Sequence, residues 1–146
     1  MQKTEDYKNL IEKHRKEVEE FPIAYAFSDE QLKEAMKKLG VKHLSECTTI
    51  FRMGDIMLKK DVPRYVQLIE RHRKEILDAM KDKEYAVAAF RYEMDNHEYA
   101  INWDGDSDVL KCFGLTLETL NSMGLADAYM AARKGHMNYM SEIGVI

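Results

Sequence analysis

IAYAFSDEQLKEAMKKLG, residues 23–40, contains the signals of a strand, a turn and a helix in direct succession. Residues 23–27 are apolar and rich in β-forming types, which predicts a short strand. Ser28 is followed three positions later by Gln31, and this capping-box pattern predicts that a helix begins here. Gly40 is suited to end that helix, because glycine adopts the left-handed backbone of a helix end without strain. This stretch therefore contributes one strand and one helix to the pattern that decides the fold class.

Apolar spacing and turn residues extend the pattern in both directions along the chain. Further helices are predicted from Thr4 to Phe21, from Asp61 to about Lys81, from Asp82 onward, over about 108–113, after Thr116 or Thr119, and from about Leu125 to Glu142. The expected fold is α+β, with a small antiparallel sheet of three or four strands (around 23–27, 47–58 and 98–103) covered by five or six helices. No linker or change of composition interrupts the chain, so one domain over residues 1–146 is expected.

The composition favours an ordinary globular protein, with 45% hydrophobic and 33% charged residues among 146. No apolar run approaches the roughly 18 residues of a membrane span, and the charged amino-terminal stretch lacks the pattern of a secretory signal. The two cysteines, Cys47 and Cys112, are far apart in the sequence and are expected to be reduced. A cytoplasmic protein is therefore expected.

Two basic segments resemble each other: YKNLIEKHRKEV at 7–18 and YVQLIERHRKEI at 65–76 are identical at eight of twelve positions. Contact with nucleic acid is one interpretation of the His-Arg-Lys runs. The other is a pair of amphipathic helices with mixed charge on their outer faces. Glutamates flank both runs and offset their charge, so direct nucleic-acid binding is not expected.

The negative charge is concentrated between residues 92 and 108, which hold six acids and no Lys or Arg. The whole chain has a net charge of −4, so the remainder sums to +2. The acids are Glu93, Asp95, Glu98, Asp104, Asp106 and Asp108. Clustered carboxylates can occupy a basic channel as phosphates do, because Lys and Arg donors accept either anion. Tyr99 and Trp103 are the candidate aromatic anchors for such a partner. The alternative is a solvated loop rim with ordinary turn residues.

A metal site is the other chemistry that this segment suggests. Glu93 and His97 are four residues apart on a predicted helix and share a face, with three aspartates in the turn that follows. The Asp-x-Asp-x-Asp spacing fails as a calcium loop, because Val109 and Leu115 stand where glycine and glutamate are required. Cys112 is expected to be a small buried hydrophobic residue. No catalytic residue, metal or cofactor is therefore predicted.

The last predicted helix carries an apolar, methionine-rich stripe that includes Met130, Met137 and Met140. Such a stripe usually forms the core face of a helix, whereas methionine also suits adaptable contact surfaces. A homodimer therefore stays open.

Three stretches carry a resemblance to a known family: AFSDEQL at 26–32 with Met36 and Gly40, FRYEMDNHEY at 90–99, and Leu110 with FGLT at 113–116. Together they resemble a family of small uncharacterised proteins encoded on bacterial phages, plasmids and conjugative elements, over roughly residues 21–120. The sequence departs at 50–58, where the family is glycine-richer and only Gly54 is found. The resemblance implies a host-interaction or anti-defence context, in which anti-CRISPR proteins occur.

The leading hypothesis is a non-enzymatic binding module of a mobile genetic element. Its partner would be a host protein, such as a nuclease or another nucleic-acid-binding defence protein, contacted through the acidic segment. The alternative is a metal-dependent hydrolase that uses Glu93, His97 and the nearby aspartates.

Overall fold

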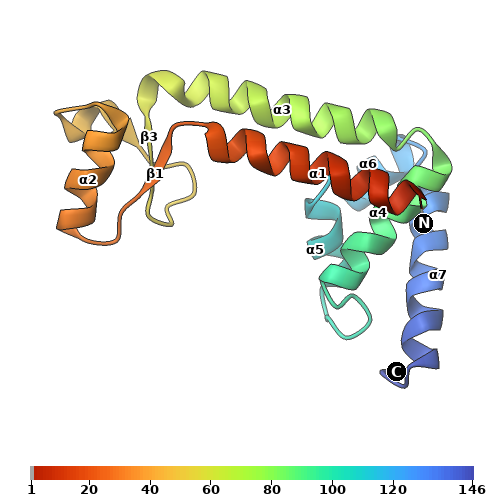
Figure 1. The fold of residues 1–146 in the computed structure, drawn as a ribbon. Coiled ribbons are helices and arrows are strands. Elements are labelled where there is room, and N and C mark those ends of the chain that lie inside the picture. Colours follow the sequence, from red (N-terminus) through yellow and green to blue (C-terminus); the bar gives the residue numbers. More distant parts are fainter. Residues whose placement is uncertain (1) are drawn as a thin grey trace. The chain divides into compact units, whose positions relative to one another are not determined.

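The structure is a computed structural model that describes residues 2–146. Its elements, shown in Figure 1, are α1 Gln2–Glu20, β1 Ile23–Tyr25, α2 Asp29–Leu39, β2 Cys47–Thr48, β3 Asp55–Leu58, α3 Val62–Ala79, α4 Lys83–Asn96, α5 Gly105–Lys111, α6 Leu117–Ser122 and α7 Ala126–Glu142. Short 3₁₀ turns lie at Leu44–Glu46 and Lys59–Asp61. The α+β class is confirmed, with seven α-helices and a three-stranded antiparallel sheet in the described residues. No helix among them combines the length and apolar character needed to cross a membrane.

The chain forms two compact units. The larger unit comprises residues 2–12 and 72–146, and the smaller unit comprises residues 13–71. The smaller unit is thus inserted in sequence into the larger one, and α1 and α3 each contribute residues to both. That the two units form a single domain stays a prediction.

The smaller unit contains the sheet, in the strand order β1-β3-β2. Ala24 of β1 lies opposite Ile56, and Cys47 of β2 lies opposite Leu58. The predicted helix start is confirmed, since the Ser28 hydroxyl accepts a hydrogen bond from the Gln31 N–H at 3.2 Å. Gly40 ends α2 in the left-handed conformation, at φ 74°. The residues that predicted the start and the end of α2 therefore do delimit that helix in the structure.

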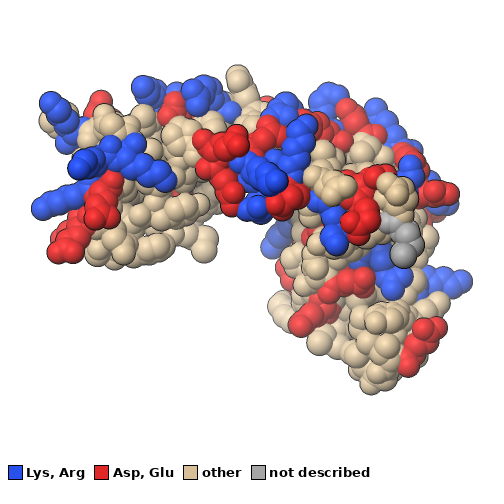
Figure 2. All heavy atoms as spheres, in the orientation of Figure 1, with Lys and Arg blue, Asp and Glu red and all other residues tan. Residues whose placement is uncertain are grey.

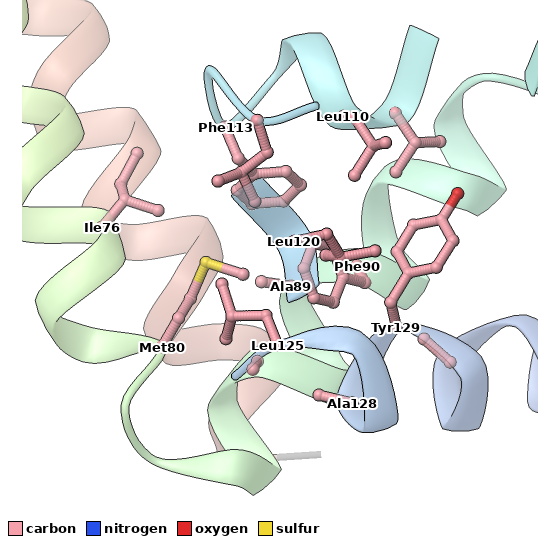
Figure 3. Close-up of a cluster of buried hydrophobic side chains, with 14 of the residues drawn as sticks. Ile76, Met80, Ala89, Phe90, Leu110, Phe113, Leu120, Leu125, Ala128 and Tyr129 are labelled. Carbon is pink, nitrogen blue, oxygen red and sulfur yellow. The ribbon is translucent and has the colours of Figure 1, made fainter. Parts of the chain in front are cut away.

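The core of the larger unit lies where α4 packs against α7 (Figure 3). Small residues line this contact and let the helices approach closely: Ala86, Ala89, Ala128 and Ala132 are almost completely buried. Phe90 is fully buried and meets the rings of Phe113 and Tyr129 edge to face, at centroid distances of 5.0 and 5.1 Å. This aromatic cluster fixes α4, and with it the loop that follows.

One predicted strand and one predicted helix start are wrong. Residues 98–103 form a chain of turns instead of a strand, and all three strands lie within residues 23–58. Glu98 adopts a left-handed backbone, at φ 51°, and its carbonyl accepts the N–H groups of Ile101 and Asn102. The chain therefore curls instead of extending. Thr4 lies inside α1, which begins at Gln2.

Candidate functional site

The loop between α4 and α5, residues 97–104, projects from the helices of the larger unit (Figure 1). Its tip is apolar: Trp103 is 96% exposed and Ile101 is 63% exposed. A side chain as large as tryptophan is normally mostly buried in a folded protein. Such exposure marks a candidate contact site, provided that the loop has a fixed conformation.

Asn102 holds the loop from inside. Its side-chain amide donates to the Asp108 carboxylate at 2.7 Å and to the His97 carbonyl at 3.4 Å. Its side-chain oxygen accepts the Asp104 N–H at 3.0 Å. One side chain thus joins the beginning of the loop, its end and the helix α5 that follows.

His136 holds the loop from α7. This imidazole is fully buried, and its Nε2 accepts the Ala100 N–H at 3.2 Å. Because Nε2 is an acceptor, the proton of the neutral ring lies on Nδ1, which donates to the Asp95 carboxylate at 2.7 Å. The contact links residues 36 positions apart in the sequence and fastens the loop to the core.

Tyr99 points back toward α5 and α7. Its hydroxyl donates to Asp106 at 2.7 Å and accepts from the Arg133 guanidinium at 3.1 Å, while Tyr129 donates to the same Asp106 oxygen. Burial, reinforced by the Asp106 hydrogen bond, raises the pKa of both tyrosines. Gly105 lies against the Tyr99 ring so closely that a Cβ there would come within 2.7 Å of it. Tyr99 thus has a structural role, in addition to the predicted role as an anchor.

The six acids of the segment do not form one continuous carboxylate surface. Glu93 is buried and accepts a hydrogen bond from Tyr7, and Asp95 accepts one from His136. Asp106 and Asp108 accept from the tyrosines and from Asn102. Asp95 and Asp106 are exposed as well as hydrogen-bonded, whereas the exposed residues Glu98 and Asp104 lie beside the apolar tip of the loop. These two carboxylates are the ones best placed to meet a partner.

A second group of polar side chains lies at the base of the loop. His97 Nε2 is 3.4 Å from Glu93 Oε2 and 3.3 Å from Cys112 Sγ. Tyr7 donates to the other oxygen of Glu93, Oε1, at 3.1 Å, and burial raises the pKa of Tyr7. Burial, together with the hydrogen bond to Glu93 and its charge, raises the pKa of the Cys112 thiol to about 12.

This cluster corrects two predictions. Cys112 is exposed as a whole residue, but its thiol turns inward and makes polar contacts, so it is not the buried hydrophobic residue that its neighbours suggested. The ligand atoms of Glu93, His97 and Cys112 lie within 4.8 Å of one another, and within the described part of the chain none of Asp104, Asp106 and Asp108 joins them. Cys112 was missed because it lies 15 residues from His97 in the sequence.

Sequence reasoning also missed the loop before β3. Asp55 is buried, and its carboxylate accepts hydrogen bonds from the N–H groups of Ile50, Phe51 and Met53. The Thr49 hydroxyl donates to it as well, at 2.9 Å. The only sequence signal was the Gly54-Asp55 pair, which predicted a turn and nothing more.

The basic segments of α1 and α3 carry ion pairs within and between the two helices. Arg15 pairs with Glu19 along α1, Lys74 with Asp78 along α3, and Arg71 of α3 with Glu17 of α1. Figure 2 shows Lys and Arg side chains interspersed with Asp and Glu on the face drawn. This mixture matches the amphipathic interpretation of the repeated segments.

The fold and the loop define a small α+β protein whose larger unit presents a fixed, apolar loop tip. The chain belongs to the family of unknown function DUF7659, which matches residues 6–135. Neither a curated protein nor a solved structure matches the chain.

Proposed function

We propose that this protein is a non-enzymatic binding module that docks on another protein through the 97–104 loop. The observation that carries the proposal is the 96% exposure of Trp103. Its loop is held by two hydrogen bonds, one from Asn102 to Asp108 and one from the Ala100 N–H to His136. A held loop loses little conformational entropy on binding, and tryptophan is among the residues that contribute most to protein interfaces.

The chemistry of the loop indicates the kind of partner. Trp103 and Ile101 require an apolar pocket, and the exposed carboxylates of Glu98 and Asp104 favour Lys or Arg at its rim. A host nuclease or another nucleic-acid-binding defence protein has this combination wherever its phosphate-binding residues border a hydrophobic cleft. We place the protein in the cytoplasm of a bacterial host as an element-encoded inhibitor.

Free cysteines support the compartment in this proposal. Cys47 and Cys112 are both unpaired by disulfides. Free thiols are the usual state of cysteine in a reducing cytosol.

The first experiment captures the partner at the loop itself. A photo-crosslinking amino acid replaces Ile101 in the full chain expressed in bacteria, and the matched control carries it at Lys134, an exposed position on α7. We expect one protein to be crosslinked from position 101 and not from position 134. Equal labelling from both positions would refute docking through the loop.

The second experiment measures the affinity of the captured protein for defined variants. Trp103→Ala should weaken binding by about 30-fold or more, the loss expected for a central aromatic anchor. The double variant Glu98→Lys, Asp104→Lys should reduce the salt dependence of binding. Phe27→Ala, which removes an exposed ring from the smaller unit, serves as the control and should bind normally. Wild-type affinity in Trp103→Ala would contradict the proposal.

The hydrolase alternative has weaker geometric support. Asp106 and Asp108 accept internal hydrogen bonds and lie outside the Glu93–His97–Cys112 group in the described structure. Two of the three aspartates that this alternative requires, Asp106 and Asp108, are therefore committed to holding the loop.

A further inference from the structure

We infer that Glu93, His97 and Cys112 form a binding site for a zinc-like divalent cation at the base of the 97–104 loop. This site is independent of the proposed partner surface, since none of the three side chains belongs to the apolar tip. All three residues lie in the larger unit. Glu93 lies in the last turn of α4, His97 caps that helix, and Cys112 caps α5.

The orientation of the imidazole separates a metal site from a catalytic triad. In a cysteine–histidine–acid triad, one ring nitrogen faces the thiol and the other faces the carboxylate. Here the same nitrogen, Nε2, faces both Cys112 Sγ at 3.3 Å and Glu93 Oε2 at 3.4 Å. This arrangement does not form a proton relay through the ring, whereas convergence of S, N and O on one point is what a bound cation requires.

The distances between the donor atoms fit that cation. Zinc binds thiolate at about 2.3 Å and imidazole or carboxylate at about 2.0–2.2 Å in tetrahedral geometry, which places neighbouring ligand atoms about 3.3–3.6 Å apart. The two measured separations, 3.3 and 3.4 Å, correspond to this spacing. The third pair, Glu93 and Cys112, is within 4.8 Å and closes with a small side-chain rotation.

The donor set selects the type of metal. A thiolate with an imidazole suits zinc and related borderline cations, whereas magnesium and calcium prefer oxygen ligands alone. Three protein ligands leave a fourth position for water or a further ligand. The His97 side chain is 38% exposed, which gives the ion a path from solvent.

Tyr7 supplies the supporting contact that metal sites commonly have. Its hydroxyl donates to Glu93 Oε1 at 3.1 Å and leaves Oε2, the oxygen nearer His97, directed at the site. Hydrogen bonds of this kind orient the ligand and hold its charge. A cation here would also join Glu93 and His97, where the loop begins, to Cys112 after it.

The test uses cobalt as a spectroscopic substitute for zinc in the full-length, tag-free, metal-stripped protein. Co²⁺ bound by a thiolate produces a sulfur-to-metal charge-transfer band, and tetrahedral coordination gives intense visible absorption. We expect equimolar Co²⁺ binding with both signals, displacement of both by Zn²⁺, and a rise in Tm on adding Zn²⁺. Absence of the charge-transfer band in the wild-type protein would overturn the inference.

Variants assign the signal to the site. Cys112→Ser should lose the charge-transfer band, while Cys47→Ser, which changes the other free cysteine, should keep it. Tyr7→Phe should retain the band with about 10- to 100-fold weaker affinity, the usual effect of removing a supporting hydrogen bond. If Cys112→Ser unfolds by circular dichroism, His97→Gln replaces it and should lose the tetrahedral visible bands. Persistence of the wild-type spectrum in a folded Cys112 or His97 variant would exclude these ligands.

Discussion

Asp55 illustrates how one buried charge can organise a loop. Burial alone would oppose ionisation, yet three backbone N–H groups and the Thr49 hydroxyl point at the carboxylate and lower the pKa of Asp55 well below its usual range. The charge is therefore retained in the folded protein because the loop supplies donors in place of water. The loop in turn depends on the charge.

Replacing this carboxylate should destabilise the smaller unit. Asp55→Asn keeps the shape but loses the charge and half of the acceptor capacity, so we expect a loss of about 1.5–3 kcal/mol at pH 7, the scale of hydrogen bonds to a charged group. Denaturant unfolding checks this value. Asp29→Asn, an exposed acid in the first turn of α2, is the matched control and should cost less than about 1 kcal/mol.

The same pair of proteins gives a pH test. Because the pKa of Asp55 is lowered in the folded state, the unfolded state binds the proton first. The stabilisation by Asp55 is thus complete above the unfolded pKa of about 3.9 and is lost as pH falls toward the folded pKa. The difference in unfolding free energy between wild type and Asp55→Asn should shrink from pH 7 to pH 3. A constant difference would show that the carboxylate is not the titrating group.

Among the elements, those specified by local contacts could be predicted from the sequence. The start and end of α2 depend on Ser28, Gln31 and Gly40, which lie within or next to the helix that they delimit. The 97–104 loop could not be predicted in this way. Its aromatic and β-branched residues resemble a strand, but the bond from Ala100 to His136 spans 36 positions and overrides that preference.

The contact between α7 and the loop can be tested at His136. His136→Ala removes the acceptor of the Ala100 N–H and the donor to Asp95, and it leaves a cavity. We expect a loss of about 2–4 kcal/mol in stability and faster hydrogen exchange of the Ala100 amide. Mass spectrometry or NMR measures the hydrogen exchange of the Ala100 amide in both proteins. The exposed histidine variant His43→Ala should leave both quantities unchanged. Unaltered protection of the loop in His136→Ala would mean that α7 does not hold it.

In the candidate sites too, the sequence predicts what depends on residues close together in the chain and does not predict what depends on the fold. Spacing along a helix was enough to pair Glu93 with His97, and side-chain type was enough to single out Trp103. Cys112 could not be added to the first pair from the sequence, because the turn of the chain between α4 and α5 brings it there. Nor could the sequence show that Asp106 and Asp108 serve the loop, since their hydrogen bonds from Tyr99 and Asn102 depend on how the loop curls.

For the whole molecule, stability should depend mainly on the aromatic core of the larger unit. Phe90 is fully buried between two other rings, so Phe90→Ala should cost about 3–5 kcal/mol. Phe27→Ala makes the same chemical change at a ring that is 75% exposed and should alter stability by about 0.5 kcal/mol or less. Thermal and denaturant unfolding compare the two. Similar losses would contradict the assignment of the core in Figure 3.

The hydrogen bond between Tyr7 and Glu93 joins residues 86 positions apart, and it has a consequence for synthesis on the ribosome. Residues 13–71 emerge between the two parts of the larger unit. The smaller unit can therefore begin to fold while the partners of Tyr7 have not yet been translated, a delay of several seconds at about 5–20 residues per second. Until then the apolar face of α1 has no core residues of α4 to pack against. A nascent chain paused near residue 90 thus exposes the apolar face of α1 to chaperones and proteases.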